Sequence, residues 1–294
     1  MISIVIIVKN DKRIEKLLKH LEKIPKPEKS ETIVVDASEG SLDYIKEKFP
    51  YARWYNFLNK TNKRYTYAEQ RNLGIRKAKG DIIVFIDSDA IPTKNWLKEI
   101  IKSIKQDKEN FVAGRVKSLG KKTFNDITWE KRKRGYIPEC GALNLAFRKN
   151  IINIVGIFDE NLEEGEDLDF TWRIIKSGYR IKYEPKIIVY HDWGDGNISL
   201  SRAFRYGTAK TKLYRKHSDR LLNLIGRDFV LLAYPLYILL LPLTFVCPYY
   251  PLVILIPVLK NIKNHPFRTT ITNLVKGLGI LTEFFAPKKY KIVK

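Results

Sequence analysis

Apolar residues in the first half of the chain form two alternating kinds of pattern. Residues 4–8, 32–35 and 82–86 are continuous runs rich in Ile and Val, as expected of strands that are buried on both faces. Residues 14–24 carry apolar side chains every three or four positions, and residues 67–79 predict a second helix that ends at Gly80. This alternation predicts an α/β fold, with a mostly parallel sheet flanked by helices.

Polar residues follow three of these strands. The same reasoning predicts further helices over 41–49, 93–106 and 166–177, and further strands over 52–57, 142–148 and 187–190. Asn10, Asp36 and Asp87 all fall at the carboxyl ends of predicted strands. Ligands of open α/β sheets bind at the carboxyl ends of the strands, so these three positions are candidate ligand contacts. Each one alone is equally well explained as a helix cap.

The pattern changes after about residue 198. Residues 200–217 predict a basic amphipathic helix, with its cations on one face and apolar side chains on another. The four cations of that face are Arg202, Arg205, Lys212 and Lys216. We expect this face to contact lipid phosphates at an anionic membrane. A nucleic-acid-binding helix and a helix that only packs against the protein are the alternatives.

Residues 229–259 contain no charged side chain. A single helix of this length would exceed the roughly 30 Å hydrocarbon core of a bilayer, and Pro248 and Pro251 interrupt it. We therefore expect a hairpin of two short membrane helices, followed by an interfacial helix over 271–285. Basic residues on both flanks predict that both ends face the cytoplasm. The chain is thus divided into an α/β domain, 1–198, and a membrane-associated region, 199–294.

Composition narrows the class of protein. The net charge is +22, with 54 Lys and Arg against 32 Asp and Glu, so phosphorylated substrates, anionic lipid or nucleic acid are candidate partners. A lysine-rich surface without a dedicated partner explains many of the scattered charges equally well. The two cysteines, Cys140 and Cys247, indicate neither a disulfide framework nor a zinc site. Residues 1–8 lack a basic leader and predict a buried strand instead of a signal peptide.

Two groups of acids carry candidate chemistry. Asp87 and Asp89 follow the strand 82–86 and are suited to hold Mg²⁺ or Mn²⁺ together with a diphosphate. Glu166 and Asp167 lie in the first turn of a predicted helix, where a carboxylate could act as general base or merely complement the helix dipole. His191 ends the strand 187–190 and is a third metal ligand only if the fold brings it to Asp89.

The helix 67–79 carries Arg71 and Asn72 just upstream of the Asp-x-Asp strand. These side chains could face a base or a phosphate, although an exposed polar helix face is the simpler interpretation.

The order of these segments resembles the inverting glycosyltransferases of family 2, which have the GT-A fold. The resemblance covers roughly residues 2–215. It is carried by residues 3–10, 34–38, 71–80, 87–89, 140–148, 165–169 and 189–191. Two departures, Val8-Lys9-Asn10 after the first strand and Ala37 after Asp36, leave the nucleobase open.

The resemblance implies a role for each matched residue. Asp36 would bind the nucleobase, Arg71 the base or diphosphate, and Asp87 the ribose side of the donor. Asp89 and His191 would bind the metal, and His191 could instead contact the diphosphate. Asp167 would be the catalytic base, supported by Glu166 and Asp169. The residues expected around the donor, with Asn10 included from its place at a strand end, are Asn10, Gly141, Ala142 and Asn144.

We therefore expect an inverting glycosyltransferase that uses Mn²⁺ or Mg²⁺ and a nucleoside-diphosphate sugar. The expected acceptor is a polyprenyl phosphate or a lipid-linked glycan at the cell membrane, with the catalytic domain on the cytoplasmic side and no nucleic-acid partner. A non-catalytic membrane protein that binds sugar nucleotides is the alternative.

Overall fold

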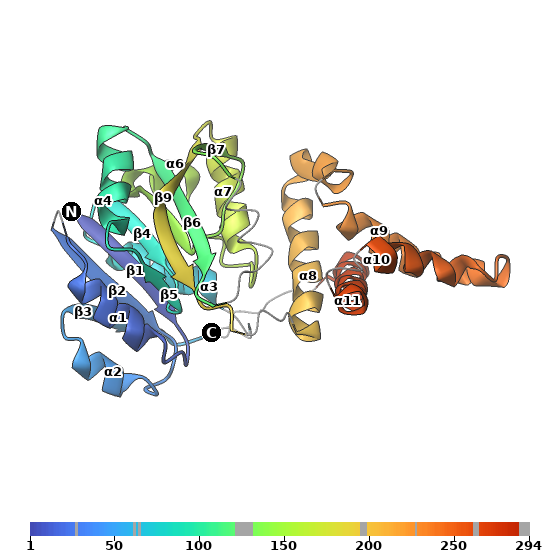
Figure 1. Cartoon of the computed structure of the whole chain (residues 1–294), viewed down its shortest axis with the longest axis horizontal. Helices are drawn as coiled ribbons and strands as arrows, with labels where there is room; N and C mark the ends of the chain where they lie inside the picture. Colours follow the sequence, from blue (N-terminus) through green and yellow to red (C-terminus); the bar gives the residue numbers. More distant parts are fainter. Residues whose placement is uncertain are drawn as a thin grey trace. The chain divides into compact units, whose positions relative to one another are not determined.

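The computed structural model describes residues 1–26, 29–60, 63, 66–120, 132–194, 199–226, 228–260 and 265–287. The chain forms two compact units, an α/β unit that extends to Gly196 and a helical unit that begins at Asn197 (Figure 1). The expected boundary at residue 198 lies outside the described residues.

The α/β unit is built on one mixed sheet, whose strands in the described residues follow the order β3-β2-β1-β4-β8-β6-β9-β5, with β7 paired to β9. The strands are β1 (Ile2–Val8), β2 (Ser30–Asp36), β3 (Ala52–Asn56), β4 (Ile82–Ile86), β5 (Ala90–Pro92), β6 (Phe111–Ser118), β7 (Gly135–Ile137), β8 (Asn144–Arg148) and β9 (Ile181–His191). Strands β1 to β4 pair in parallel, and so do β6 and β9. Strands β5, β7 and β8 run antiparallel to their partners, so the sheet is less parallel than the sequence pattern predicted.

Helices cover both faces of this sheet. They are α1 (Ile14–Lys23), α2 (Asp43–Lys48), α3 (Tyr67–Lys77), α4 (Trp96–Ile101), the π-helical turn η1 (Lys102–Gln106), the 3-10 turn η2 (Lys149–Ile151), α6 (Ile152–Val155) and α7 (Glu166–Lys176). Alternate residues of β1 serve the two layers: Ile4 and Ile6 pack with α1 and α4, whereas Val5 packs with α3 and α7. This period of two explains why the strand is a continuous apolar run.

Strand β6 was not predicted. Phe111 to Gly114 are buried, but the strand continues through the partly exposed Arg115, Val116, Lys117 and Ser118, so its apolar run is short. Pairing with β8 and β9 on its two sides holds this strand in place. Such pairing is a non-local property that a local pattern does not record.

The helical unit contains α8 (Leu200–Lys216), η3 (Ser218–Leu224), α9 (Val230–Leu239), η4 (Leu241–Phe245), η5 (Tyr250–Ile254), α10 (Leu255–Lys260) and α11 (Pro266–Phe285). Helices α8 and α11 pack closely through glycines. A Cβ atom on Gly207 would lie 2.1 Å from the Lys276 carbonyl oxygen, and one on Gly279 would lie 2.1 Å from the Phe204 carbonyl oxygen. Only glycine permits this approach at either position.

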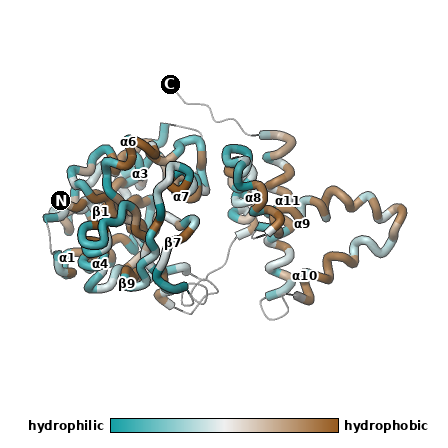
Figure 2. The backbone as a smooth tube through the Cα atoms, turned by 90° about the horizontal axis from the view of Figure 1, so that it is seen from above, coloured by the Kyte–Doolittle hydropathy of each residue, from teal (hydrophilic) through white to brown (hydrophobic). Residues whose placement is uncertain are grey.

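The uncharged segment folds back on itself between α9 and α10. The Tyr237 and Tyr250 rings stack with their centroids 5.5 Å apart. The Tyr250 hydroxyl donates to the Tyr237 carbonyl at 3.1 Å, and the Tyr237 hydroxyl donates to the Pro251 carbonyl at 3.2 Å. Figure 2 shows this hairpin as a largely hydrophobic loop of the helical unit. Its side chains include the most exposed apolar residues of the unit, Phe245 at 94% and Val246 at 85%.

The membrane elements differ in part from the sequence prediction. None of the helices in the described residues combines the length and apolar character needed to cross a bilayer, so the expected transmembrane helix finds no support. The helix expected over 271–285 is the longer α11, which packs against α8 and α9.

The faces of α8 also differ from those predicted. The buried side of the helix consists of Ala203, Gly207, Ala209, Leu213 and Tyr214. The apolar Leu200 is 52% exposed, whereas Ala209, which lies in the sequence between Arg205 and Lys212, is buried. Of the four predicted cations, Arg202 and Lys216 are exposed, and Arg205 and Lys212 are partly buried.

Candidate active site

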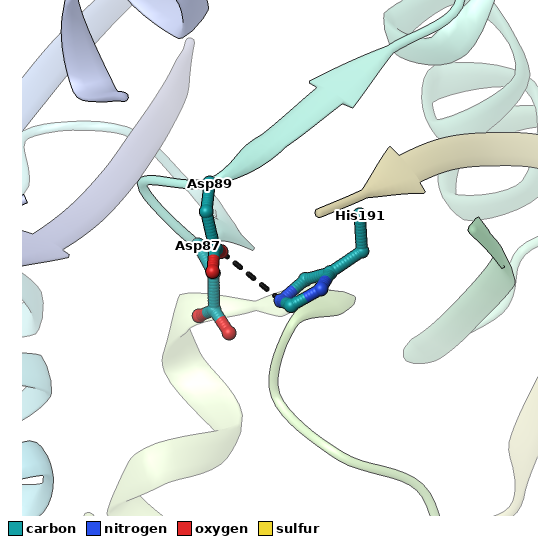
Figure 3. Close-up of side chains that lie close together, drawn as sticks. All are labelled: Asp87, Asp89 and His191. Atoms are coloured by element: carbon teal, nitrogen blue, oxygen red, sulfur yellow. Dashed lines mark ion pairs between the residues drawn. The ribbon is translucent and has the colours of Figure 1, made fainter. Parts of the chain in front are cut away.

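Asp87, Asp89 and His191 lie together at the end of β4 (Figure 3). Asp87 directly follows β4, and the chain then turns through Ser88 and Asp89 into β5. Strand β5 pairs antiparallel with β9 so that Ala90 is opposite His191. This pairing places the His191 Nε2 atom 3.0 Å from Asp89 Oδ1. The third ligand proposed from the sequence is therefore beside the Asp-x-Asp pair.

The donor atoms of this cluster fit a divalent cation. Each of the three side chains offers one ligand atom, and these atoms lie within 4.8 Å of one another. Within the described residues, the buried Nδ1 atom of His191 has no hydrogen-bond partner, and the ring lies 3.9 Å from the Trp193 ring, centroid to centroid. Desolvation raises the pKa of Asp87; Arg71 opposes this rise and the neighbouring charge of Asp89 adds to it. The two carboxylates are ligands suited to Mn²⁺ or Mg²⁺, and the imidazole nitrogen is a common ligand of transition metals.

Arg71 connects this cluster with the acids of α7. Its guanidinium hydrogen-bonds to Glu166 and lies 3.6 Å from Asp87 Oδ1. Burial disfavours the charge of Arg71, but Glu166, Asp87 and Asp167 together raise its pKa. The neighbouring Asn72 binds both the N–H and the carbonyl of Phe158. Residues 69–72 are buried, which excludes the exposed polar helix face considered from the sequence.

The acids at the start of α7 have three different environments. Gly165 precedes them with φ 81°, a left-handed conformation that glycine adopts without strain. Glu166 is buried beside Arg71. Burial raises the pKa of Glu166 to about 8, although the positive charge of Arg71 acts to lower it. Asp169 is fully buried and its Oδ2 atom lies 2.9 Å from Arg173 Nε. Glu166 and Asp169 are therefore occupied in holding neighbouring cations.

Asp167 is the acid of this turn that remains partly exposed. Its Oδ1 atom accepts a hydrogen bond from the Leu168 N–H at 2.8 Å. Its Oδ2 atom faces Gly141, where a Cβ atom would come within 3.2 Å of the carboxylate. Glycine at position 141 thus leaves space beside the carboxylate expected to act as base.

Asn10 and Asp36 lie at the ends of neighbouring strands, since Val8 of β1 pairs with Asp36 of β2. The Ser38 N–H donates to Asp36 Oδ1 at 2.8 Å, and the Asn10 N–H donates to Ser38 Oγ at 2.7 Å. Asn10 has φ 55°, so its backbone turns sharply after the strand. The structure therefore joins these two predicted donor contacts in one loop region.

Two other predicted donor contacts are placed differently. Ala142 is 1% exposed and its methyl group belongs to the core. The Asn144 side chain accepts from Trp96 Nε1 at 2.9 Å and donates to the Arg115 and Ile187 carbonyls at 3.2 and 3.1 Å. These bonds use the amide to join α4, β6 and β9, so we assign Asn144 a structural role in place of the donor-sugar role.

Three further polar residues adjoin the cluster without having been selected from the sequence. They are Asp11, Arg13 and Asp192, and the Arg13 guanidinium contacts Asp11, Asp89 and Asp192. Asp11 and Arg13 look like an ordinary helix start, and Asp192 only becomes notable beside His191. The feature of the sequence that could have indicated them is their position close in the chain to Asn10 and His191, which were candidate site residues.

The mixed sheet with acids at its strand ends has the architecture of a GT-A glycosyltransferase. The model of the family "Glycosyl transferase family 2" matches residues 3–160, more than half of the chain, and the protein belongs to this family. Its curated relatives include named glycosyltransferases, and the chain spans less than two thirds of the length of the first of them.

Three curated relatives are glycosyltransferases. A pre-mycofactocin glycosyltransferase of Mycobacterium tuberculosis is 27% identical over 188 residues, which are 57% of this chain and 39% of that protein. Glycosyltransferase AglE of Haloferax volcanii is 26% identical over 72% of this chain and 74% of its own length. A Methanococcus voltae enzyme is 24% identical over 69% of this chain and 70% of its own length. It is named dolichyl N-acetyl-alpha-D-glucosaminyl phosphate 3-beta-D-2,3-diacetamido-2,3-dideoxy-beta-D-glucuronosyltransferase.

A solved structure shares the fold. Staphylococcus aureus TarS superposes with a TM-score of 0.55 at 18% identity, covering 74% of this chain and 43% of that one.

Proposed function

We propose that this glycosyltransferase moves a sugar from a nucleoside-diphosphate donor to a lipid-linked acceptor, with inversion and with Mn²⁺ or Mg²⁺. The observation that supports this proposal best is the group formed by Asp87, Asp89 and His191, connected through Arg71 to the acids of α7. A cation site and a partly exposed carboxylate at the same edge of the sheet suit the departure of a diphosphate and the attack of a hydroxyl group.

In this proposal Asp89 and His191 hold the cation, with Asp87 beside them. The bound cation supplies positive charge that stabilises the diphosphate leaving group. Asp167 accepts the proton of the acceptor hydroxyl as that oxygen bonds to the anomeric carbon. Arg71, kept charged by Glu166 and Asp87, adds a fixed cation near the donor phosphates. Asn10, in the loop after β1, and Asp36, the last residue of β2, contact the nucleoside.

The helical unit supports a membrane-proximal acceptor. The α9–α10 hairpin exposes large apolar side chains, whose burial in lipid is worth about 1.5–3 kcal/mol each. We propose that the hairpin enters one leaflet without crossing the bilayer, and that Arg202, Arg205, Lys212 and Lys216 contact lipid or acceptor phosphates. The Methanococcus relative, whose name describes a dolichyl-phosphate sugar, supports the same class of acceptor.

We further propose that the protein resides at the cell membrane with its active site on the cytoplasmic side. The basic residues on both flanks of the hairpin, such as Arg220 and Arg268, support this orientation. Fractionation of the full-length protein with and without detergent tests the membrane part. Protein that stays in the soluble fraction without detergent would contradict it.

The transfer reaction is tested with a panel of labelled nucleoside-diphosphate sugars and two acceptors, a polyprenyl phosphate and a polyprenyl-phosphate-linked sugar. We expect lipid-extractable label only in the presence of Mn²⁺ or Mg²⁺. Asp89→Asn should lower the rate by at least about 10³-fold, because a bound metal contributes several kcal/mol. The control Asp43→Asn changes an exposed acid of α2 and should leave the rate unaltered. Full activity in excess chelator would contradict the metal-dependent mechanism.

A further inference from the structure

Arg13 forms a compact network with three carboxylates at the edge of the candidate metal site. Its Nε and Nη2 atoms each lie 2.9 Å from one oxygen of Asp11, the paired geometry that a guanidinium forms with a carboxylate. Its Nη2 atom also lies 3.0 Å from Asp89 Oδ2. Its Nη1 atom donates to the Asp192 carbonyl at 3.0 Å and lies 3.4 Å from the Asp192 carboxylate.

Asp89 is shared between this network and the cation site. One oxygen of Asp89 faces His191 at 3.0 Å, and the other faces Arg13 at 3.0 Å. A divalent cation bound to Asp89 would therefore meet the guanidinium at the same carboxylate. The cation and the Arg13 guanidinium are both positively charged and would both contact Asp89. They would repel each other, so they compete for this carboxylate.

Arg13 is also suited to leave. Its side chain is 44% exposed, and it stands at the start of α1, outside the packed core. Asp89 in contrast is only 17% exposed and is held by the β5–β9 pairing. The flexible partner of the pair is thus the arginine. A guanidinium released here lies beside the proposed position of the donor diphosphate, with which it pairs as readily as with carboxylates.

We propose that Arg13 is the counter-charge of Asp89 and exchanges its carboxylate partners for the donor diphosphate when a divalent cation binds Asp89. This inference rests on the proposed function. It assigns Arg13 two opposite effects: it weakens the binding of the cation alone, and it strengthens the binding of the nucleotide once the cation is present. A purely structural arginine would have no reason to act in opposite directions.

The experiment measures the two affinities separately in Arg13→Gln. Free Mn²⁺ is followed by electron paramagnetic resonance without nucleotide, and UDP and GDP binding is followed by calorimetry in saturating Mn²⁺. We expect Mn²⁺ alone to bind about three- to tenfold more tightly, the scale of one or two partly exposed ion pairs. We expect nucleotide to bind about tenfold more weakly, as for the loss of charge-assisted hydrogen bonds.

Two further variants control the result. Arg13→Lys keeps the charge but loses the paired geometry, so both affinities should shift in the same two directions by smaller amounts. Lys12→Gln removes the same unit charge from the exposed neighbouring residue and should alter neither affinity.

Opposite shifts in the two affinities support the exchange. Shifts in the same direction, or an unchanged affinity for either ligand in both Arg13 variants, overturn it. A wild-type protein that binds Mn²⁺ but neither nucleotide contradicts the proposed donor class and the diphosphate half of the exchange. The Mn²⁺ measurement still decides, independently of the donor, whether Arg13 opposes the cation.

Discussion

The two units of this protein depart from the usual distribution of side chains in opposite ways. In the α/β unit, ionisable groups are buried: the side chains of Arg71, Glu166 and Asp169 are 8%, 5% and 0% exposed. In the helical unit, apolar groups are exposed, up to 94% for Phe245. Isolated exposed apolar residues are common, but a buried charge and a continuous apolar hairpin both require an explanation.

The difference indicates two kinds of recognition. Buried charges are costly unless they are paired, and the proposed function places these pairs where charge would develop during glycosyl transfer. Exposed apolar surface is costly in water and becomes favourable in lipid. The contrast is what the proposed function expects, with a polar ligand in the α/β unit and a lipid contact in the helical unit. Four substitutions test this comparison, two in each unit.

Among these four substitutions, the largest effect is expected from Asp167→Asn. The amide keeps the shape of the side chain but does not accept the proton of the acceptor, so turnover should fall by about 10²- to 10⁴-fold while nucleotide affinity is retained. Steady-state transfer rates and nucleotide calorimetry make this measurement. Glu163→Gln, a nearby acid outside the helix, should leave turnover nearly unchanged.

Glu166→Gln distinguishes the two neighbouring acids. Since Glu166 pairs with Arg71, its loss should act mainly on nucleotide binding. If Glu166→Gln abolishes turnover and Asp167→Asn is mild, Glu166 is the base instead. If both are mild, these acids only stabilise the start of α7.

A smaller effect, confined to the helical unit, is expected from Gly207→Ala. The added methyl group would meet the Lys276 carbonyl of α11, and relieving that clash should lower the free energy of unfolding by about 1–3 kcal/mol. Gly226→Ala, where no neighbouring atom lies within 4 Å of the added carbon, is the matched control.

All five tryptophans lie before residue 197, so tryptophan fluorescence reports the α/β unit. Gly207→Ala should therefore shift the urea transition seen by circular dichroism more than the one seen by fluorescence. Equal shifts with both probes would show that the two units unfold together, and would weaken the comparison between them.

The smallest effect is expected from Phe245→Ala in the hairpin. Partitioning onto vesicles that contain anionic phospholipid should fall by about tenfold, as one aromatic ring is removed from the lipid contact. Ile154→Ala, on α6 and 66% exposed, removes a comparable apolar group from the other unit and should not alter partitioning. Equal losses in both variants would show that the hairpin is not the specific membrane contact.

The sequence by itself determined the local elements and the strand ends that carry polar residues. Periods of two and of 3.6 residues are local properties, so β1, β2, β4, α1 and α7 were predicted close to their observed positions. The same reasoning selected Asp87, Asp89 and Asp167, because acids after a buried strand or at a helix start are visible in the chain.

Only the tertiary structure decided which of these residues meet. The β5–β9 pairing brings His191 to Asp89 across about a hundred residues of sequence, and a network around Arg13 joins three separate loops. Asn144 lost its expected role because three internal groups use its amide. The glycine contacts between α8 and α11 likewise depend on two segments far apart in the chain. Each of these features is a non-local contact, and the periodicity of one segment contains no record of its partner.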